Sequence, residues 1–257
     1  MSLDRRRWLA GVGATLGSLW LAGCDRLTAN PTFTGVLKVA EKWTQGAQRL
    51  VTDRKALARE FTPADISKDF KPNGTMRPQD PAYLALLVGN FAGYRLVVDG
   101  LVEQPLSLSL AEVRAAPSRT QITRHDCVEG WSSIGKWKGA RLSALLDRAK
   151  LKPEARYIVF HCADTLDPAA TDGAGQYYES IDLVDAYHPQ TILAYQMNDA
   201  TLPVRHGAPL RLRVERQLGY KHAKYVMRVE AVASLDGIGR GQGGFWPDRG
   251  YEWYAGI

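Results

Sequence analysis

The most informative part of the chain is residues 124–132, which read Arg124-His125-Asp126-Cys127-Val128-Glu129-Gly130-Trp131-Ser132. The thiol of Cys127 lies there among charged, glycine and tryptophan residues, ahead of a predicted amphipathic helix rather than inside an apolar run. Reactive and metal-binding cysteines need electropositive, partly open surroundings. We therefore expect Cys127 to act as a thiolate ligand or as a nucleophile.

A disulfide is the competing interpretation of this cysteine. The chain holds 3 cysteines, Cys24, Cys127 and Cys162. If Cys24 carries a lipid, as argued next, the other two remain and could pair in an oxidising compartment. The count alone leaves both interpretations open.

The N-terminus has the pattern of an export signal over residues 1–23. Arg5-Arg6-Arg7 precedes an apolar stretch of about 14 residues, below the roughly 18 that indicate a spanning helix. Twin arginines are typical of export after folding, which suits a protein that must first bind a cofactor. Leu21-Ala22-Gly23-Cys24 resembles a lipobox, and Asp25 resembles an inner-membrane retention signal. We expect a periplasmic lipoprotein anchored at Cys24; an uncleaved apolar anchor is the alternative.

Composition and charge exclude several classes of protein. At 45% hydrophobic and 23% charged residues the chain is an ordinary globular protein, and its net charge of +6 is too mild to argue for nucleic acid. The basic residues are interrupted by apolar strand positions and form no nucleic-acid motif. No nucleic-acid partner is expected.

Periodicity predicts a sheet-rich, mixed α+β fold. Apolar residues at helical spacing predict an amphipathic helix over residues 38–60, and residues 62–82 read as an extended loop. Asp99-Gly100 predicts a hairpin turn after a strand over residues 94–98. The remaining expected elements are helices over residues 109–116, 142–149 and 181–187, and strands over residues 157–160, 193–197, 210–214 and 224–235. We divide the chain into the signal, an N-terminal segment over residues 24–61 and one domain over residues 62–257.

A basic segment over residues 205–225 is the third signal. Gly207 and Gly219 allow close approach of the backbone to an anion, and Arg211, Lys221 and Lys224 supply charge-assisted donors for a phosphate or a pterin edge. A solvated strand face bearing alternating cations is the alternative.

Five ordered blocks together resemble the molybdopterin-binding oxidoreductases of the sulfite oxidase fold. The chain is most similar to the bacterial periplasmic branch related to methionine-sulfoxide reductase catalytic subunits. The blocks are Val-Asp-Gly-Leu-Val at 98–102, Cys-Val-Glu-Gly-Trp-Ser at 127–132, Trp-Lys-Gly at 137–139, Gly-Ala-Pro-Leu-Arg-Leu at 207–212 and Gly-Tyr-Lys-x-x-Lys at 219–224. Each is weak alone, and their order behind a twin-arginine signal makes the match specific.

The resemblance implies a site. Cys127 matches the cysteine that binds molybdenum beside the dithiolene of one molybdopterin per chain, and soft sulfur donors suit this metal. Arg211 matches an arginine that holds the pterin phosphate, and Lys221 lies in the same basic segment. The other implied cofactor contacts are Asn73, Cys162, His206, His222, Ala223 and Lys224; the resembling branch has threonine at Cys162 and asparagine at His206. A Cys127–Cys162 disulfide would abolish this site, so none is expected.

The resemblance also implies an activity. We expect two-electron oxygen-atom transfer on a sulfoxide or a sulfite, with electrons exchanged with a separate haem partner in the membrane or a soluble cytochrome, by a monomeric enzyme. A sulfite site should gather cations, for which Arg124, His125, Arg205 and Lys221 are candidates, whereas Trp131 and Tyr220 could line a neutral pocket. Glu129 is either a proton relay or a solvated acid. The C-terminal aromatics over residues 244–254 are a packed closing segment or a partner surface. A non-catalytic lipoprotein on the same fold is the alternative function.

Overall fold

The computed structural model describes residues 31–171 and 174–257. The chain divides into two compact units, Met1–Thr52 and Asp53–Ile257. In the first, the described part is one helix, α2 (Pro31–Val51), on which Val39, Trp43 and Leu50 are exposed. The expected signal peptide and the lipid site at Cys24 lie outside the described residues. None of the helices within the described ranges is both long and apolar enough to cross a membrane.

The expected bounds of the first helix were wrong. The helix runs from Pro31 to Val51 instead of from 38 to 60, and Glu60 forms an antiparallel bridge with Thr123 of β3 (Ser118–Asp126). The amide of Phe61 donates to the carbonyl of Ile122 at 2.9 Å. These residues leave the helical path because the edge of β3 offers hydrogen-bond partners for their backbone, which must be satisfied wherever it is buried.

One sheet has five strands in the order β2-β1-β10-β5-β6. Their bounds are Arg95–Gly100 (β1), Leu106–Ser109 (β2), Tyr157–Thr165 (β5), Gln176–Asp182 (β6) and Val226–Val232 (β10). The expected turn at Asp99-Gly100 was wrong, because both residues stay in β1 and pair in parallel with Glu230 and Ala231. Gly100 has a φ of +81° there, and a Cβ would lie 2.3 Å from the carbonyl oxygen of Ala231. This glycine therefore permits a close strand pairing.

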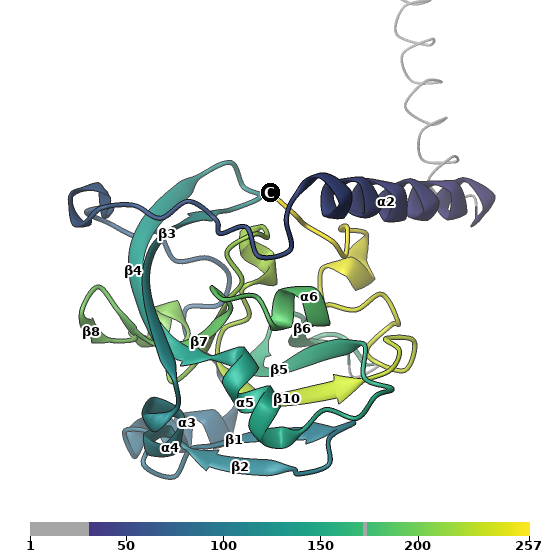
Figure 1. The fold of residues 1–257 in the computed structure, drawn as a ribbon. Coiled ribbons are helices and arrows are strands. Elements are labelled where there is room, and N and C mark those ends of the chain that lie inside the picture. Colours follow the sequence, from purple (N-terminus) through teal and green to yellow (C-terminus); the bar gives the residue numbers. More distant parts are fainter. Residues whose placement is uncertain (1–30, 172–173) are drawn as a thin grey trace, which may run out of the picture. The chain divides into compact units, whose positions relative to one another are not determined.

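The second sheet carries the long hairpin on which the site is built (Figure 1). It joins β3 to β4 (Ser132–Arg141), β7 (Ile192–Met197) and β8 (Ala200–Thr201), and β9 (Arg211–Arg213) also pairs with β7. β3 and β4 are antiparallel from Ser118–Ala140 to Asp126–Ser132, so Cys127 begins the turn between them. The sheet-rich α+β class is confirmed.

Short helices connect the strands. They are α3 (Pro81–Val88), α4 (Leu110–Ala115), α5 (Leu142–Ala149) and α6 (Leu183–Ala186), with 3₁₀ turns at Pro63–Asp65, Val204–His206, Gly219–Lys221 and Pro247–Arg249. α4 begins at the predicted capping box, in which the Ser109 hydroxyl accepts from the Glu112 amide at 3.2 Å. Such a cap contributes about 1 kcal/mol. α5 has the predicted bounds and buries its whole apolar face in the main core.

Candidate active site

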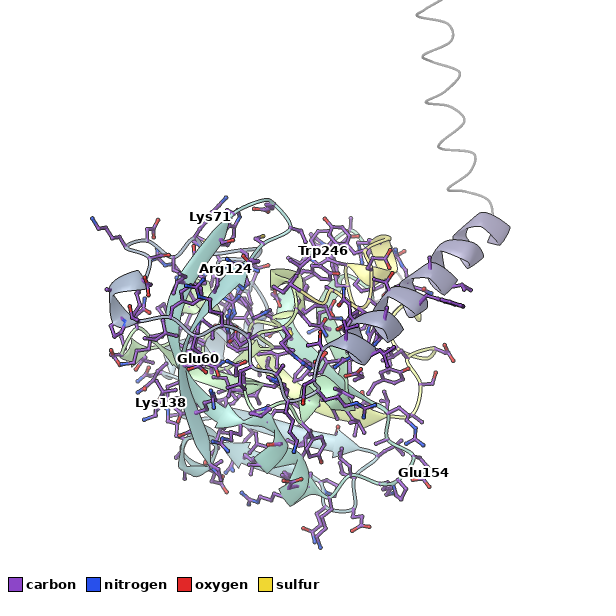
Figure 2. All side chains as sticks on the ribbon, turned by 45° about the horizontal axis from the view of Figure 1, so that its top comes forward. Glu60, Lys71, Arg124, Lys138, Glu154 and Trp246 are labelled. Carbon is purple, nitrogen blue, oxygen red and sulfur yellow. The ribbon has the colours of Figure 1, made fainter. Side chains whose placement is uncertain are left out.

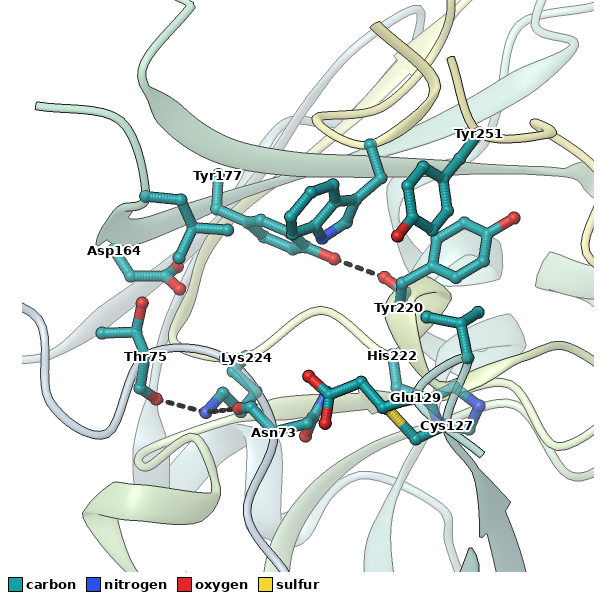
Figure 3. A pocket seen from close by; sticks show the side chains of 14 residues that line it. Asn73, Thr75, Cys127, Glu129, Asp164, Tyr177, Tyr220, His222, Lys224 and Tyr251 are labelled. Atoms are coloured by element: carbon teal, nitrogen blue, oxygen red, sulfur yellow. Dashed lines mark hydrogen bonds between the residues drawn. The ribbon is translucent and has the colours of Figure 1, made fainter. Parts of the chain in front are cut away.

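A cavity opens at the tip of the β3–β4 hairpin and contains about 740 Å³ of space, counting the part open to solvent (Figure 3). It brings together segments far apart in the sequence: the loop at 73–75, the hairpin tip, β5, β6, the segment after β9 and the C-terminal segment. The lining residues are Asn73, Gly74, Thr75, Cys127, Val128, Glu129, Asp164, Leu166, Tyr177, Tyr220, His222, Lys224, Trp246 and Tyr251.

A tight turn presents Cys127 to this cavity. The Cys127 amide donates to the Trp131 carbonyl at 2.9 Å, and the Gly130 amide donates to the Cys127 carbonyl at 3.0 Å. Gly130 has a φ of +83°, which glycine adopts at little cost. Cys127 and Cys162 are both free thiols. Burial raises the pKa of the Cys127 thiol; a hydrogen bond from the Glu129 backbone opposes this rise and the Glu129 charge adds to it, so the protein alone does not favour a thiolate. This disfavours a nucleophile; a soft metal ion would displace the proton on binding.

The exterior of the hairpin is charged, and its cations are paired. Lys71 lies 3.8 Å from the Glu129 carboxylate and 5.1 Å from the centre of the Trp131 ring. Arg124 pairs with Asp126 at 2.8 Å, and Figure 2 shows Lys71 and Arg124 on this side of the molecule. The side chain of Glu129 is 62% exposed and also accepts from Trp131 Nε1 at 2.9 Å. These contacts favour a solvated acid over a proton relay.

The loop at 73–75 is held in place by Lys224. Its ammonium donates to the carbonyl of Asn73 at 2.6 Å, to the carbonyl of Arg205 at 3.2 Å and to the carbonyl of Thr75. An ammonium has three donors, so all of them are used on backbone carbonyls. Lys224 therefore lines the cavity, as predicted, but it shapes the wall rather than offering a free cation.

Arg211 and His206 lie directly behind this wall. Arg211 donates to the Asn73 side chain at 3.2 Å and to the His206 carbonyl at 3.3 Å, and it has no exposed surface. Burial, followed by the charge of the neighbouring Arg213, lowers the pKa of Arg211 to about 9. Burial lowers the pKa of His206 to about 3, with Arg211 the next cause. Arg211 is thus a buried cation next to a neutral imidazole, and the buried carboxylate of Glu215 nearby is paired with Arg213.

Several buried polar atoms around the cavity have no hydrogen-bond partner among the described residues. They include Arg211 Nε, His206 Nδ1, His222 Nδ1 and Asp164 Oδ1. Native proteins leave few such groups unsatisfied, and those that remain often mark a missing ligand. The buried cation Arg211 and these unpaired polar atoms, beside one soft sulfur donor, fit a group that carries a phosphate, a polar ring and a metal. The residues present therefore fit a molybdenum–pterin cofactor.

Lys221 and Cys162, two of the residues predicted to contact the cofactor, do not line the cavity. Lys221 is fully buried against Glu179 in an ion pair and lies 5.2 Å from the centre of the Trp253 ring. Its charge is committed to Glu179 and it does not line the cavity, and its contact with a cofactor stays a prediction. Cys162 is buried next to the cavity, with Sγ 3.8 Å from the Phe160 carbonyl, and does not line it. Ala223 is buried, and its carbonyl accepts from the Leu212 amide at 2.8 Å.

Sequence reasoning missed part of the wall. Asp164 lies in β5 beyond residue 160, where the predicted strand ended, and the available signal was an acid directly after a buried apolar run. The C-terminal aromatics serve two purposes: Phe245 is in the core, whereas Trp246 and Tyr251 line the cavity. Trp246 and Tyr251 pack with ring centres 5.2 Å apart, which gives the cavity an aromatic side.

Comparison with known proteins gives consistent matches. The model of the oxidoreductase molybdopterin binding domain matches residues 86–235. A protein of Azospira oryzae, provisionally named protein-methionine-sulfoxide reductase subunit YedZ1, is 34% identical over 257 residues, which cover 100% of this chain and 89% of that protein. The protein-methionine-sulfoxide reductase catalytic subunit MsrP of Xanthomonas axonopodis pv. citri is 30% identical over 239 residues, covering 90% and 71%. The sulfane dehydrogenase SoxCD of Paracoccus pantotrophus aligns with a TM-score of 0.48 and 24% identity, covering 56% and 39% of the two chains.

Proposed function

Because the chain belongs to the oxidoreductase molybdopterin-binding family, we propose that it reduces a sulfoxide to a thioether by two-electron oxygen-atom transfer. The chain is an enzyme, a molybdopterin-dependent oxidoreductase. The balanced reaction consumes two electrons and two protons, and it converts R₂S=O into R₂S and water. The cofactor supplies the oxygen-atom and electron chemistry when it is bound.

The chain's own residues hold and orient that group. Cys127 offers the thiol that would bind the metal, at the hairpin tip that lines the cavity. Arg211 supplies a buried positive charge, and the neutral imidazoles of His206 and His222 supply unpaired polar atoms, a combination that suits an anionic phosphate. Lys224 holds the Asn73 loop that closes this side. We propose one cofactor per chain.

The observation that carries the choice of a sulfoxide is the character of the exposed wall. A sulfite dianion needs free cations, and Arg124, His125, Arg205 and Lys221 were the candidates. Within residues 31–171 and 174–257, none of these four lines the cavity. Much of the wall is formed instead by the uncharged side chains Val128, Leu166, Tyr177, Tyr220, Trp246 and Tyr251. Of the charged residues that line it, Glu129 and Asp164 are acids, and the Lys224 ammonium donates to backbone carbonyls. A neutral, polarisable sulfoxide suits aromatic surroundings better than a dianion does.

The cellular setting is part of the same proposal. Arg5-Arg6 and the Leu21-Ala22-Gly23-Cys24 stretch support export of the folded protein to the periplasm and attachment to the inner membrane as a lipoprotein. An enzyme at that surface can receive electrons from a membrane haem protein or a soluble cytochrome. We propose that it works as a monomer with such a separate partner.

An activity screen tests the direction and the substrate. The purified enzyme is assayed with sulfoxides and reduced viologen, and separately with sulfite and a dye acceptor. We expect turnover of the sulfoxides and little or none of sulfite. Preferred oxidation of sulfite would contradict the proposed substrate, and inactivity on both would remove the analogy with sulfur-oxide substrates for this chain.

A further inference from the structure

Helix α2 exposes several large apolar side chains. Val39 is 54% exposed, Trp43 77% and Leu50 87%. Single exposed apolar residues are normal in soluble proteins, but a contiguous apolar patch marks a surface that binds something. Steps of four and seven residues separate these three positions, so at 3.6 residues per turn they lie on one face of the helix. We call this face the apolar stripe of α2.

The sequence of α2 suits the surface of a bilayer. Besides the apolar stripe, the helix contains three cations, Lys38, Lys42 and Arg49, and one acid, Glu41. By helical spacing, none of these four positions lies on the stripe. A helix with an apolar face and an excess of cations beside it binds in the plane of an anionic membrane, where tryptophan is a favoured residue. α2 is not both long and apolar enough to cross a membrane, so its stripe would lie along the surface of one.

The position of α2 in the chain favours a bilayer over other partners. Cys24, the proposed lipid site, lies seven positions before Pro31, where the helix begins. Seven residues span at most about 25 Å when fully extended, so a lipid on Cys24 would keep the start of α2 close to the membrane. The alternative, an uncleaved apolar anchor, has the same effect. At its other end the helix stops at Val51, and the second unit begins at Asp53. α2 therefore connects the proposed anchor directly to the catalytic unit.

We propose that α2 binds the surface of an anionic bilayer, with Val39, Trp43 and Leu50 among the acyl chains just below the headgroups. This inference rests on the membrane attachment of the proposed function and adds a second contact to it. A lipid fixes one point of the chain, whereas a helix in the surface fixes a whole segment. The catalytic unit then stays within a short connection of the bilayer, where a membrane haem protein would supply its electrons.

The test measures contact between Trp43 and lipid. The protein is produced from its full-length gene, purified from the membrane fraction and returned to vesicles of equal parts phosphatidylcholine and phosphatidylglycerol. Lipids with brominated acyl chains quench the fluorescence of a tryptophan that touches them. We expect these lipids to quench part of the wild-type emission, and we expect that quenched part to be lost in Trp43→Phe. Equal quenching in the two proteins would overturn the inference, and recovery of the protein with the membrane would still leave the proposed attachment standing.

A protein recovered in the soluble fraction would contradict the proposed attachment, and flotation with the same vesicles then tests α2 by itself. Trp43→Gln/Leu50→Gln should bind at least about tenfold more weakly than the wild type, because two apolar side chains no longer enter the lipid.

Val88→Gln is the matched control, because Val88 is an apolar residue of α3 that is 90% exposed and lies outside the stripe. It should bind like the wild type. A soluble wild type that does not bind these vesicles would overturn both the attachment and the inference. The inference would also be overturned if Trp43→Gln/Leu50→Gln converted an oligomer into a monomer in light scattering, because a second copy of the chain would then cover the stripe.

Discussion

Replacing Lys221 by methionine should destabilise the protein strongly and in a pH-dependent way. The side chains of Lys221 and Glu179 form an ion pair with no exposed surface, and Glu179 also forms a bridge with Gly244 of the C-terminal segment. Removing one partner of such a pair leaves a buried charge uncompensated, which costs about 3–5 kcal/mol. We therefore expect Lys221→Met to lower the free energy of unfolding by that amount at pH 8.

The pKa of Glu179 sets the pH dependence. Burial raises this pKa from 4.5 to about 7, although Lys221 lowers it. A raised pKa in the folded state means that stability from this group is fully present below pH 4.5 and is lost as the pH rises through 7. The loss in the wild type is about 3 kcal/mol, from 1.36 kcal/mol per pKa unit. At pH 5 the folded carboxyl is already neutral, so the penalty in Lys221→Met should be much smaller than at pH 8.

Urea unfolding followed by tryptophan fluorescence measures both effects. Trp253 is a suitable reporter because Lys221 lies beside its ring and Trp253 Nε1 donates to Ser180 Oγ at 2.8 Å. Replacing Glu179 by methionine as well should recover most of the loss, since no unpaired charge remains. Arg95→Met is the control, because the Arg95–Glu112 pair is exposed and should contribute less than about 1 kcal/mol. A cost below about 1 kcal/mol for Lys221→Met at pH 8, or an equal cost at both pH values, would refute the reasoning.

Three further predictions concern the cavity. Trp246→Ala should raise KM for sulfoxides by about tenfold and leave the pterin content unchanged, because it removes an apolar aromatic contact of about 1.5 kcal/mol with the substrate. Steady-state kinetics and pterin analysis check this, and an unchanged KM would count against it. Lys224→Met should free the loop at Asn73, lower the cofactor content severalfold and speed proteolysis there, and a fully loaded, protected variant would be the opposite result. The pKa of His206 is about 3 in the folded protein and 6.5 ordinarily, so on acidification the unfolded chain binds this proton first. The free energy of unfolding should therefore fall by up to about 1.4 kcal/mol for each unit by which the pH is lowered from 6.5 to 3. Urea unfolding of His206→Gln should lack this contribution, and pH profiles identical to the wild type would contradict it.

Local patterns predicted those parts of the fold that depend on neighbouring residues. The capping box of α4 and the apolar face of α5 lie within single turns of helix, and both formed as expected. The first helix was misplaced because the path of the chain after Val51 depends on β3, which comes about 70 residues later. The Asp99-Gly100 turn failed for the same kind of reason, since β10 pairs with it from the far end of the chain.

The candidate site likewise contains residues that the sequence predicted and residues whose place only the fold determines. Cys127, Asn73, His222 and Lys224 were predicted and do line one cavity, although the contacts of the last three with a cofactor remain predictions. Lys221 was assigned from its place in a basic segment, and only the fold brings Glu179, 42 positions earlier, against it. Asp164 was missed because its exposure to the cavity arises from an irregular strand pairing that no local pattern announces.

The central claim is that Cys127 binds molybdenum in this cavity. The most direct measurement is the molybdenum content per chain together with the number of sulfur neighbours of the metal, determined by X-ray absorption, in the wild type and in Cys127→Ala. Ser132→Ala is the control, because it removes the contact between Ser132 and Asp126 at the base of the same hairpin turn and keeps the thiol. We predict stoichiometric molybdenum in the wild type and in the control, and in Cys127→Ala either loss of the metal or one sulfur neighbour fewer. A wild type without stoichiometric molybdenum, or a Cys127→Ala protein with full metal and an unchanged sulfur count, would contradict the claim.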